Sequence, residues 1–277
     1  MSTASTFTQK LTINDIHQPV KSVGAHLAAK LELFCTDERT LTDELCDMLC
    51  IWLGMQFNPS YAAIVGPSFD LTISKTTTAE EVKTGADLEL IVQSPLGSKR
   101  CLIQAKVLDP GTNKLRCASK QGWNKLRKQL VDARNEVGDL AFLLIYIPMK
   151  HLNGNSYGYA TYEQAGIFTV KGSLPASYGA TLIPVDKLIG SSGRWRNRKK
   201  KVPRSSSGGF KNGISFWRVL LELMLCRRSE WSTDHKHIDA QEISPFRTLG
   251  FRASEISKDS WEELQLMADQ FLESSDS

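Results

Sequence analysis

The 277 residues of this chain are 41% hydrophobic and 23% charged, a composition typical of a globular protein that can bury a sizeable core. The longest apolar runs, at 140–148 and 216–226, are too short to cross a bilayer, and the first residues lack the basic and apolar regions of a secretory signal. The six cysteines form no C-x-x-C pair. We therefore expect reduced thiols, a cytoplasmic location and no membrane partner.

The first part of the chain predicts helices followed by extended segments. Residues 1–35 read as a polar leader and a short helix at about 23–34, and apolar residues at helical spacing predict a second helix at about 37–53. This second helix begins either at a capping box formed by Thr40 and Asp43 or a turn earlier, at Asp37. Residues 60–75 are expected to be extended, and residues 82–108 form a hairpin around a Pro/Gly turn.

The middle of the chain completes an α/β pattern. A basic helix is expected at about 119–137, and the continuous apolar run at 140–148 predicts a strand buried on both faces. Shorter strands are expected at 157–161, 166–170 and 181–185. The order of these elements predicts a mixed α/β domain with a central sheet over residues 36–190.

The net charge of +4 is unevenly distributed. Between residues 191 and 210 there are seven Lys or Arg residues and no acid, among Ser, Gly and Pro. This composition fits a flexible linker at 191–212 and equally a segment that contacts a phosphate backbone. Helices at about 213–228 and 258–274 follow, and they either cap the sheet or form a C-terminal helical appendage over 213–277.

The hairpin carries polar residues inside apolar strands. Gln104 and Lys106 share one face of their strand, because residues two apart project to the same side, and the simplest register brings Asp87 next to them. Carboxylate and amide oxygens are ligands that suit Mg²⁺. A bound metal ion activates water, and a neighbouring lysine can position that water or stabilise the charged transition state.

These residues also carry a resemblance. The sequence Gly85-Ala86-Asp87, followed by a strand with Gln104-Ala105-Lys106, resembles the core motif of the PD-(D/E)xK nuclease superfamily. The Gln variant is similar to Mrr-like restriction endonucleases and to bacterial nuclease domains linked to phage defence. The resemblance covers roughly residues 35–190. It implies a restriction-endonuclease-like core, with a central mixed sheet flanked by helices, and hydrolysis of phosphodiester bonds that depends on Mg²⁺ or Mn²⁺.

The resemblance also implies roles for single residues. Asp87 would be a metal ligand, Gln104 would take the second ligand position and Lys106 would be the catalytic lysine. The superfamily often adds an acid from the first helix as a further ligand. Glu38 is favoured, because it lies on the apolar side of its helix, and Glu44 and Glu81 are its rivals. The motif departs from the family pattern in two ways, since no proline precedes Asp87 and position 104 is not an acid.

Basic residues near the motif are candidates for binding nucleic acid, with DNA favoured over RNA. They are Lys120, Lys125, Arg127 and Lys128 in the basic helix, and Arg194, Arg196, Arg198 and Lys199 in the basic segment. A homodimer, or a sensor or ATPase partner, would suit a defence effector. Two alternatives remain: a structural ion pair between Asp87 and Lys106, and an inactive nuclease-fold module that binds nucleic acid or protein. The chain contains no P-loop, no dinucleotide-binding fingerprint and no nucleophile elbow.

Overall fold

The computed structural model describes the greater part of the chain, and every structural statement below concerns the residues it describes. These are residues 13–56, 69–94, 97–111, 115–116, 119–152, 160–163, 166–170, 179–196, 198–199, 202–203, 213–224 and 249–253. The last predicted helix, at 258–274, and most of the predicted polar leader lie outside them.

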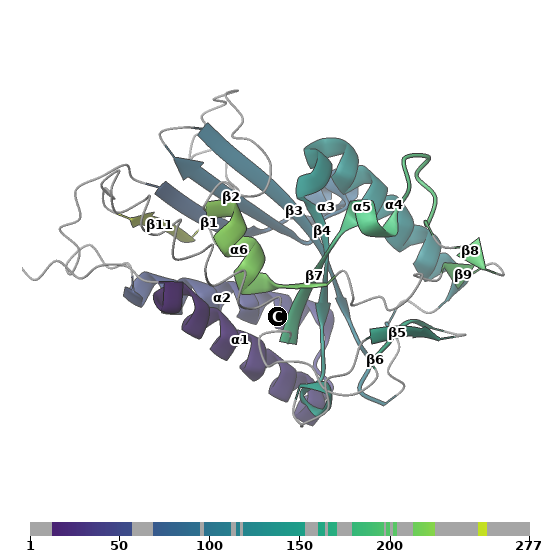
Figure 1. The fold of residues 1–277 in the computed structure, drawn as a ribbon, viewed down its shortest axis with the longest axis horizontal. Coiled ribbons are helices and arrows are strands. Elements are labelled where there is room, and N and C mark those ends of the chain that lie inside the picture. Colours follow the sequence, from purple (N-terminus) through teal and green to yellow (C-terminus); the bar gives the residue numbers. More distant parts are fainter. Residues whose placement is uncertain are drawn as a thin grey trace, which may run out of the picture.

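The described residues form a mixed α/β structure (Figure 1). The helices are α1 (Ile13–Phe34), α2 (Glu38–Gln56), α3 (Thr78–Thr84), α4 (Lys120–Val137), α5 (Val185–Leu188) and α6 (Phe216–Met224). The strands are β1 (Phe69–Lys75), β2 (Leu88–Ser94), β3 (Gly97–Val107), β4 (Ala141–Tyr146), β5 (Ala160–Glu163), β6 (Gly166–Val170), β7 (Ala180–Pro184), β8 (Arg198–Lys199), β9 (Val202–Pro203), β10 (Ile214–Ser215) and β11 (Leu249–Ala253).

One sheet organises the fold. Its seven strands have the order β10-β7-β4-β3-β2-β1-β11, and β5–β6 and β8–β9 form two separate small ribbons. Strands β3 and β4 are parallel, whereas the other neighbouring strands in this sheet are antiparallel. The α4 helix provides the crossover that a parallel pair requires. The predicted central mixed sheet flanked by helices is therefore confirmed.

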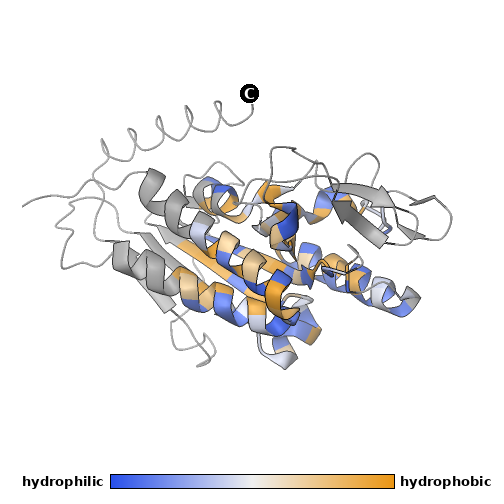
Figure 2. Ribbon diagram, turned by 90° about the horizontal axis from the view of Figure 1, so that it is seen from below, coloured by the Kyte–Doolittle hydropathy of each residue, from blue (hydrophilic) through white to orange (hydrophobic). Residues whose placement is uncertain are grey.

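Helices cover both faces of this sheet. Alternate β3 residues point to opposite faces, so Ile103, Ala105 and Val107 share a core with α1, α2 and α6, while Leu102 joins the core under α4 and α5. Figure 2 shows that the coloured helices carry both hydrophilic and hydrophobic residues, as expected for elements with one face on a core. All six residues of β4 are buried, which confirms the strand predicted from the apolar run.

The structure refines the predicted N-terminal helices. Helix α1 is longer than the predicted segment, and α2 begins at Glu38. The Asp37 side chain accepts a hydrogen bond from the Thr40 backbone N–H at 3.0 Å, so the earlier of the two predicted starts is correct.

The predicted hairpin also begins later than expected. Residues 82–84 belong to α3, a short helix that the prediction missed, and the antiparallel pair β2–β3 starts only at Leu88.

The chain beyond residue 190 is partly built into the same fold. Trp195 is buried against Trp123 of α4, with ring centroids 5.8 Å apart. The first residues of the basic segment therefore form a turn that packs against α4, which is called the docked turn below. Strand β10 pairs with β7, and Val219, Leu220 and Leu223 of α6 are buried in the main core. The described part of the predicted C-terminal region therefore caps the sheet, which is one of the two arrangements expected from sequence. None of the described helices is long and apolar enough to cross a membrane.

Candidate functional site

A tight connection between α3 and β2 places Asp87. Thr77 and Glu80 form a capping box that starts α3, and Gly85 ends it in a left-handed conformation with φ of 71°. A Cβ atom at Gly85 would lie 2.2 Å from the Gln129 carbonyl oxygen, so only glycine allows α3 to approach α4 so closely. The chain then turns directly into β2 with Asp87 at its start.

The Asp87 carboxylate accepts a hydrogen bond that a backbone carbonyl would accept in a regular β-sheet. The Asp87 backbone N–H donates to the Ile103 carbonyl at 2.9 Å, and Asp87 Oδ2 accepts the next N–H along β3, that of Ala105, at 2.7 Å. Gln104 Nε2 also donates to Asp87 Oδ2. Gln104 is 1% exposed, and its Oε1 atom is buried without a hydrogen-bond partner in the described structure.

Lys106 contacts the backbone of the same residue, Ala105, at its carbonyl group. Its Nζ donates to the Ala105 carbonyl oxygen at 2.5 Å and to Glu38 Oε1, in the first turn of α2, at 2.7 Å. Asp87, Gln104 and Lys106 thus meet at the backbone of Ala105, and Glu38 joins them through Lys106, so the four predicted site residues lie together. Within the described structure, Lys106 pairs with Glu38 and forms no direct ion pair with Asp87. The structural Asp87–Lys106 bridge considered from the sequence is not formed.

The two rival acids have different positions. Glu44 is bound to Lys30 and, at 2.8 Å, to His26 Nε2, so α1 holds it in the interface between α1 and α2. Glu81 accepts a hydrogen bond from Gln129 Nε2 at 3.2 Å and lines the same pocket as Asp87. Of the three candidate acids, Glu38 and Glu81 therefore lie near Asp87, and Glu44 does not.

Burial raises the pKa of Asp87 from 3.8 to about 6. The Lys106 ammonium opposes this rise, whereas the carboxylates of Glu38 and Glu81 add to it. The ionised carboxyl is thus insufficiently compensated by the protein alone. A proton or a bound cation would relieve this imbalance.

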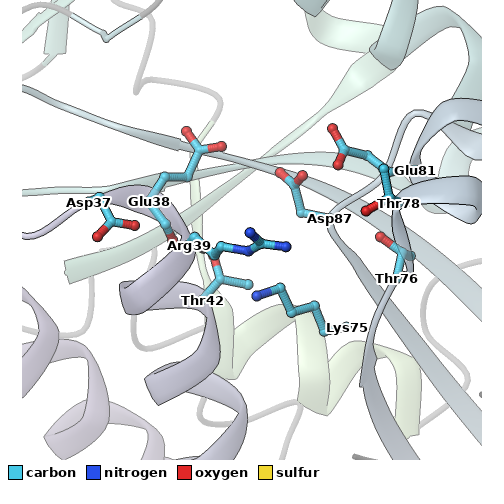
Figure 3. A pocket seen from close by; sticks show the side chains of 9 residues that line it. All are labelled: Asp37, Glu38, Arg39, Thr42, Lys75, Thr76, Thr78, Glu81 and Asp87. Carbon is cyan, nitrogen blue, oxygen red and sulfur yellow. Dashed lines mark hydrogen bonds between the residues drawn. The ribbon is translucent and has the colours of Figure 1, made fainter. Parts of the chain in front are cut away.

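Two of the four residues, Asp87 and Glu38, line a pocket of about 500 Å³ between α2 and the segment from β1 to β2 (Figure 3). Its lining residues are Asp37, Glu38, Arg39, Thr42, Lys75, Thr76, Thr78, Glu81 and Asp87. The sequence did not single out Arg39, Lys75 or the threonines. They come from two segments distant in the chain, 39–42 and 75–78, and no local pattern marks these segments as neighbours.

The donor atoms at the site are those a hard cation prefers. The Asp87 carboxylate and Gln104 Oε1, which has no hydrogen-bond partner among the described residues, are oxygen donors of the kind that bind Mg²⁺. The raised pKa of Asp87 shows that burial disfavours its charged form in the absence of a cation. Within the described residues, no group of three or more His, Cys, Asp or Glu side chains is arranged to hold a metal ion. A metal would therefore depend on Asp87, on the Gln104 amide and on oxygens of its other ligands.

The predicted nucleic-acid-binding residues do not line this pocket. Lys125 and Lys128 are exposed on α4, and Lys128 lies 3.9 Å from Asp132. Arg127 donates to the Gly193 carbonyl at 3.2 Å and so supports the docked turn. Arg194 and Arg196 are exposed, and Arg196 donates to the Asp186 carbonyl. The side chains of Lys120, Arg198 and Lys199 lie outside the described structure.

Comparison with models of known protein families gives no match for this chain, and a search of curated proteins finds none that is significantly similar. Function has to be inferred from the site itself and from the motif that it contains.

Proposed function

We propose that the protein is a nuclease that uses Mg²⁺ or Mn²⁺ to hydrolyse phosphodiester bonds, with DNA favoured over RNA, on a restriction-endonuclease-like core. The observation that carries this proposal is the convergence of Asp87, Gln104, Lys106 and Glu38 around the backbone of Ala105, where Asp87 and Glu38 line a pocket. A carboxylate, an amide and an amine brought together in this way suit one metal ion and one phosphate.

Each residue has a distinct task in this reaction. Asp87 and Gln104 would hold the metal ion, which when bound supplies Lewis acidity and a water of lowered pKa. Lys106 directs its ammonium toward the developing charge on the phosphoryl oxygens, or orients the attacking water. Glu38 holds Lys106 in place through the 2.7 Å contact and keeps its long side chain from swinging into solvent.

The resemblance of the motif is the basis for proposing a biological role. Nuclease domains of the type it resembles act in defence against phage, and we extend that role to this chain as an effector. A homodimer, or a sensor or ATPase partner, would then control when the pocket meets its substrate.

Cleavage of plasmid DNA tests the proposal. We expect the purified full chain to nick or linearise plasmid with Mg²⁺ or Mn²⁺ but not with EDTA. Lys106→Ala and Asp87→Ala should each lower the rate by about 100-fold or more, because each removes a group that acts in the transition state. Lys83→Ala is the matched control, since Lys83 is exposed and does not line the pocket. Cleavage that persists unchanged in both site variants would refute the assignment.

A second candidate is an inactive nuclease-fold module that binds nucleic acid or a protein. The neutral Gln104 and the ion pair that already occupies Lys106 favour it. For a nucleic-acid-binding module, binding should persist in EDTA, and no divalent ion should support cleavage. Combined replacement of Arg194, Arg198 and Lys199 by alanine should weaken binding and flatten its salt dependence. This variant is preferable to deleting the segment, because Trp195 is buried in the fold.

A further inference from the structure

Two cationic side chains in the pocket have no part in the proposed chemistry. Arg39 and Lys75 line it together with the carboxylates of Asp37, Glu38, Glu81 and Asp87. Figure 3 shows the carboxylates of Glu38, Asp87 and Glu81 above the cationic ends of Arg39 and Lys75, and the carboxylate of Asp37 at the level of Arg39. Three of the four carboxylates are thus set apart from the two cationic groups.

Arg39 is available for a ligand. It is exposed, and its guanidinium forms no hydrogen bond or ion pair with any residue that the structure describes. By contrast, Arg100 binds Glu89 and Glu136, and Arg134 binds the carbonyls of Ile189 and Gly190. Arg39 lines the pocket, and the five N–H donors of its guanidinium have no acceptor among the described residues.

The scaffold presents both cations toward one region. Arg39 is the second residue of α2, at the end of the helix where the backbone dipoles favour an anion. Lys75 is the last residue of β1, and its Nζ lies 2.7 Å from Asp43 Oδ1, which fixes the ammonium beside α2. A guanidinium and an ammonium that approach from two elements make a more selective anion site than either alone, because the guanidinium offers a planar fork.

We infer that Arg39 and Lys75 form a phosphate-binding subsite within this pocket. When one phosphate of a nucleic-acid strand lies at Asp87, this subsite holds the next phosphate of the same strand. The inference rests on the proposed function for the identity of the strand. The carboxylate side takes the cation, and the cationic side takes the neighbouring phosphate, so the strand crosses the pocket in a fixed direction. A single contact of this kind positions the backbone without reading its sequence.

Binding to a short fluorescent DNA duplex, measured by anisotropy on the full chain in EDTA, tests the subsite. Arg39→Ala should bind about tenfold more weakly, the equivalent of one lost charge-assisted hydrogen bond. The negative slope of log affinity against log salt concentration should also become shallower by about one unit, because one phosphate contact is lost. Arg39→Lys should recover part of the affinity, because it restores the charge without the fork.

Lys83→Ala is the matched control, since it removes one positive charge from α3, outside the pocket lining. Thermal unfolding should show that the variants remain folded. The subsite is refuted if Arg39→Ala binds as tightly as wild type, or loses no more affinity than Lys83→Ala. Because EDTA removes the divalent ions, this result is independent of cleavage, so failure of the nuclease proposal and failure of the subsite are distinguishable.

Discussion

Asp87 is a residue whose negative charge the fold tolerates poorly. Its carboxylate accepts the Ala105 N–H in place of a backbone carbonyl. The carboxylate is therefore largely buried at the edge of the β2–β3 pair, where water cannot solvate it fully. The pKa of about 6 results chiefly from this burial. Ionisation of Asp87 therefore costs folding free energy in the absence of a cation.

This cost predicts a specific dependence of stability on pH. Because the folded protein binds the Asp87 proton more tightly than the unfolded chain does, the unfolding free energy falls as pH rises from about 4 to about 6. Asp87→Asn removes the charge but keeps an oxygen that can accept the Ala105 N–H. In EDTA at pH 8, this variant should be more stable than wild type, by at most about 3 kcal/mol, and the advantage should vanish near pH 4. Urea denaturation at several pH values measures the difference, and an advantage that does not change with pH would contradict the assignment.

Gln104 sets the charge available for a metal ion. Gln104→Glu would place a second buried carboxylate beside Asp87, and we expect it to lower stability by about 2–4 kcal/mol in EDTA at pH 8. Mg²⁺ should offset this repulsion, so the increase in melting temperature on adding Mg²⁺ should be larger than for wild type.

The double variant Asp87→Asn/Gln104→Glu is the control, because it has a single carboxylate, as wild type does. Its melting temperature in EDTA should lie above that of Gln104→Glu. An equal response of wild type and Gln104→Glu to Mg²⁺ would show that no cation binds between positions 87 and 104.

At the scale of elements, the short helix α3 controls where Asp87 lies. Gly85→Ala should destabilise the protein by about 3 kcal/mol or more, because the new Cβ meets the Gln129 backbone and the left-handed φ is strained. Gly193→Ala is the matched control, since Gly193 has φ of 68° but only an ordinary contact of 3.6 Å with Val131. It should cost about 1 kcal/mol. Chemical denaturation compares the two, and equal costs would mean that the close approach of α3 and α4 is not needed.

The same elements show which features can be predicted from sequence. The β2–β3 hairpin, the buried β4 and the helix bearing Glu38 followed from periodicity, and the hairpin register brought Asp87, Gln104 and Lys106 together. Helix α3 was missed because seven residues are too few to show a helical period. Its capping residues Thr77 and Glu80 and its terminal Gly85 were the available signal.

Features that depend on distant contacts could not be predicted. Arg39 and Lys75 are 36 positions apart, and the pocket that they share exists only because α2 packs across β1. The docking of Trp195 on Trp123 depends in the same way on tertiary structure, which overrode the linker-like composition around it. The motif residues were accessible to prediction because they lie on two strands joined by one turn.

At the scale of the whole molecule, α6 packs a late segment of the chain against α1, the first described helix. Leu220 is fully buried among residues of α1 and of the sheet, so Leu220→Ala should destabilise the whole domain by about 2–5 kcal/mol. Leu33→Ala is the matched control, because Leu33 is 68% exposed and the same substitution there should be nearly neutral. Far-ultraviolet circular dichroism and tryptophan fluorescence should report one coincident transition. A separate early transition in Leu220→Ala would mean that α6 folds independently.

The bond from the Ala105 N–H to the Asp87 carboxylate gives the site an intrinsic spectroscopic probe. This N–H lies near the C-terminal end of β3, the longest described strand, yet its acceptor is a side chain whose charge changes with pH and with any bound cation. Its nuclear magnetic resonance signal should shift as that acceptor gains or loses charge. Titration of one backbone signal would then follow protonation of the site and any metal binding directly, without a substrate and without any assumption about a reaction.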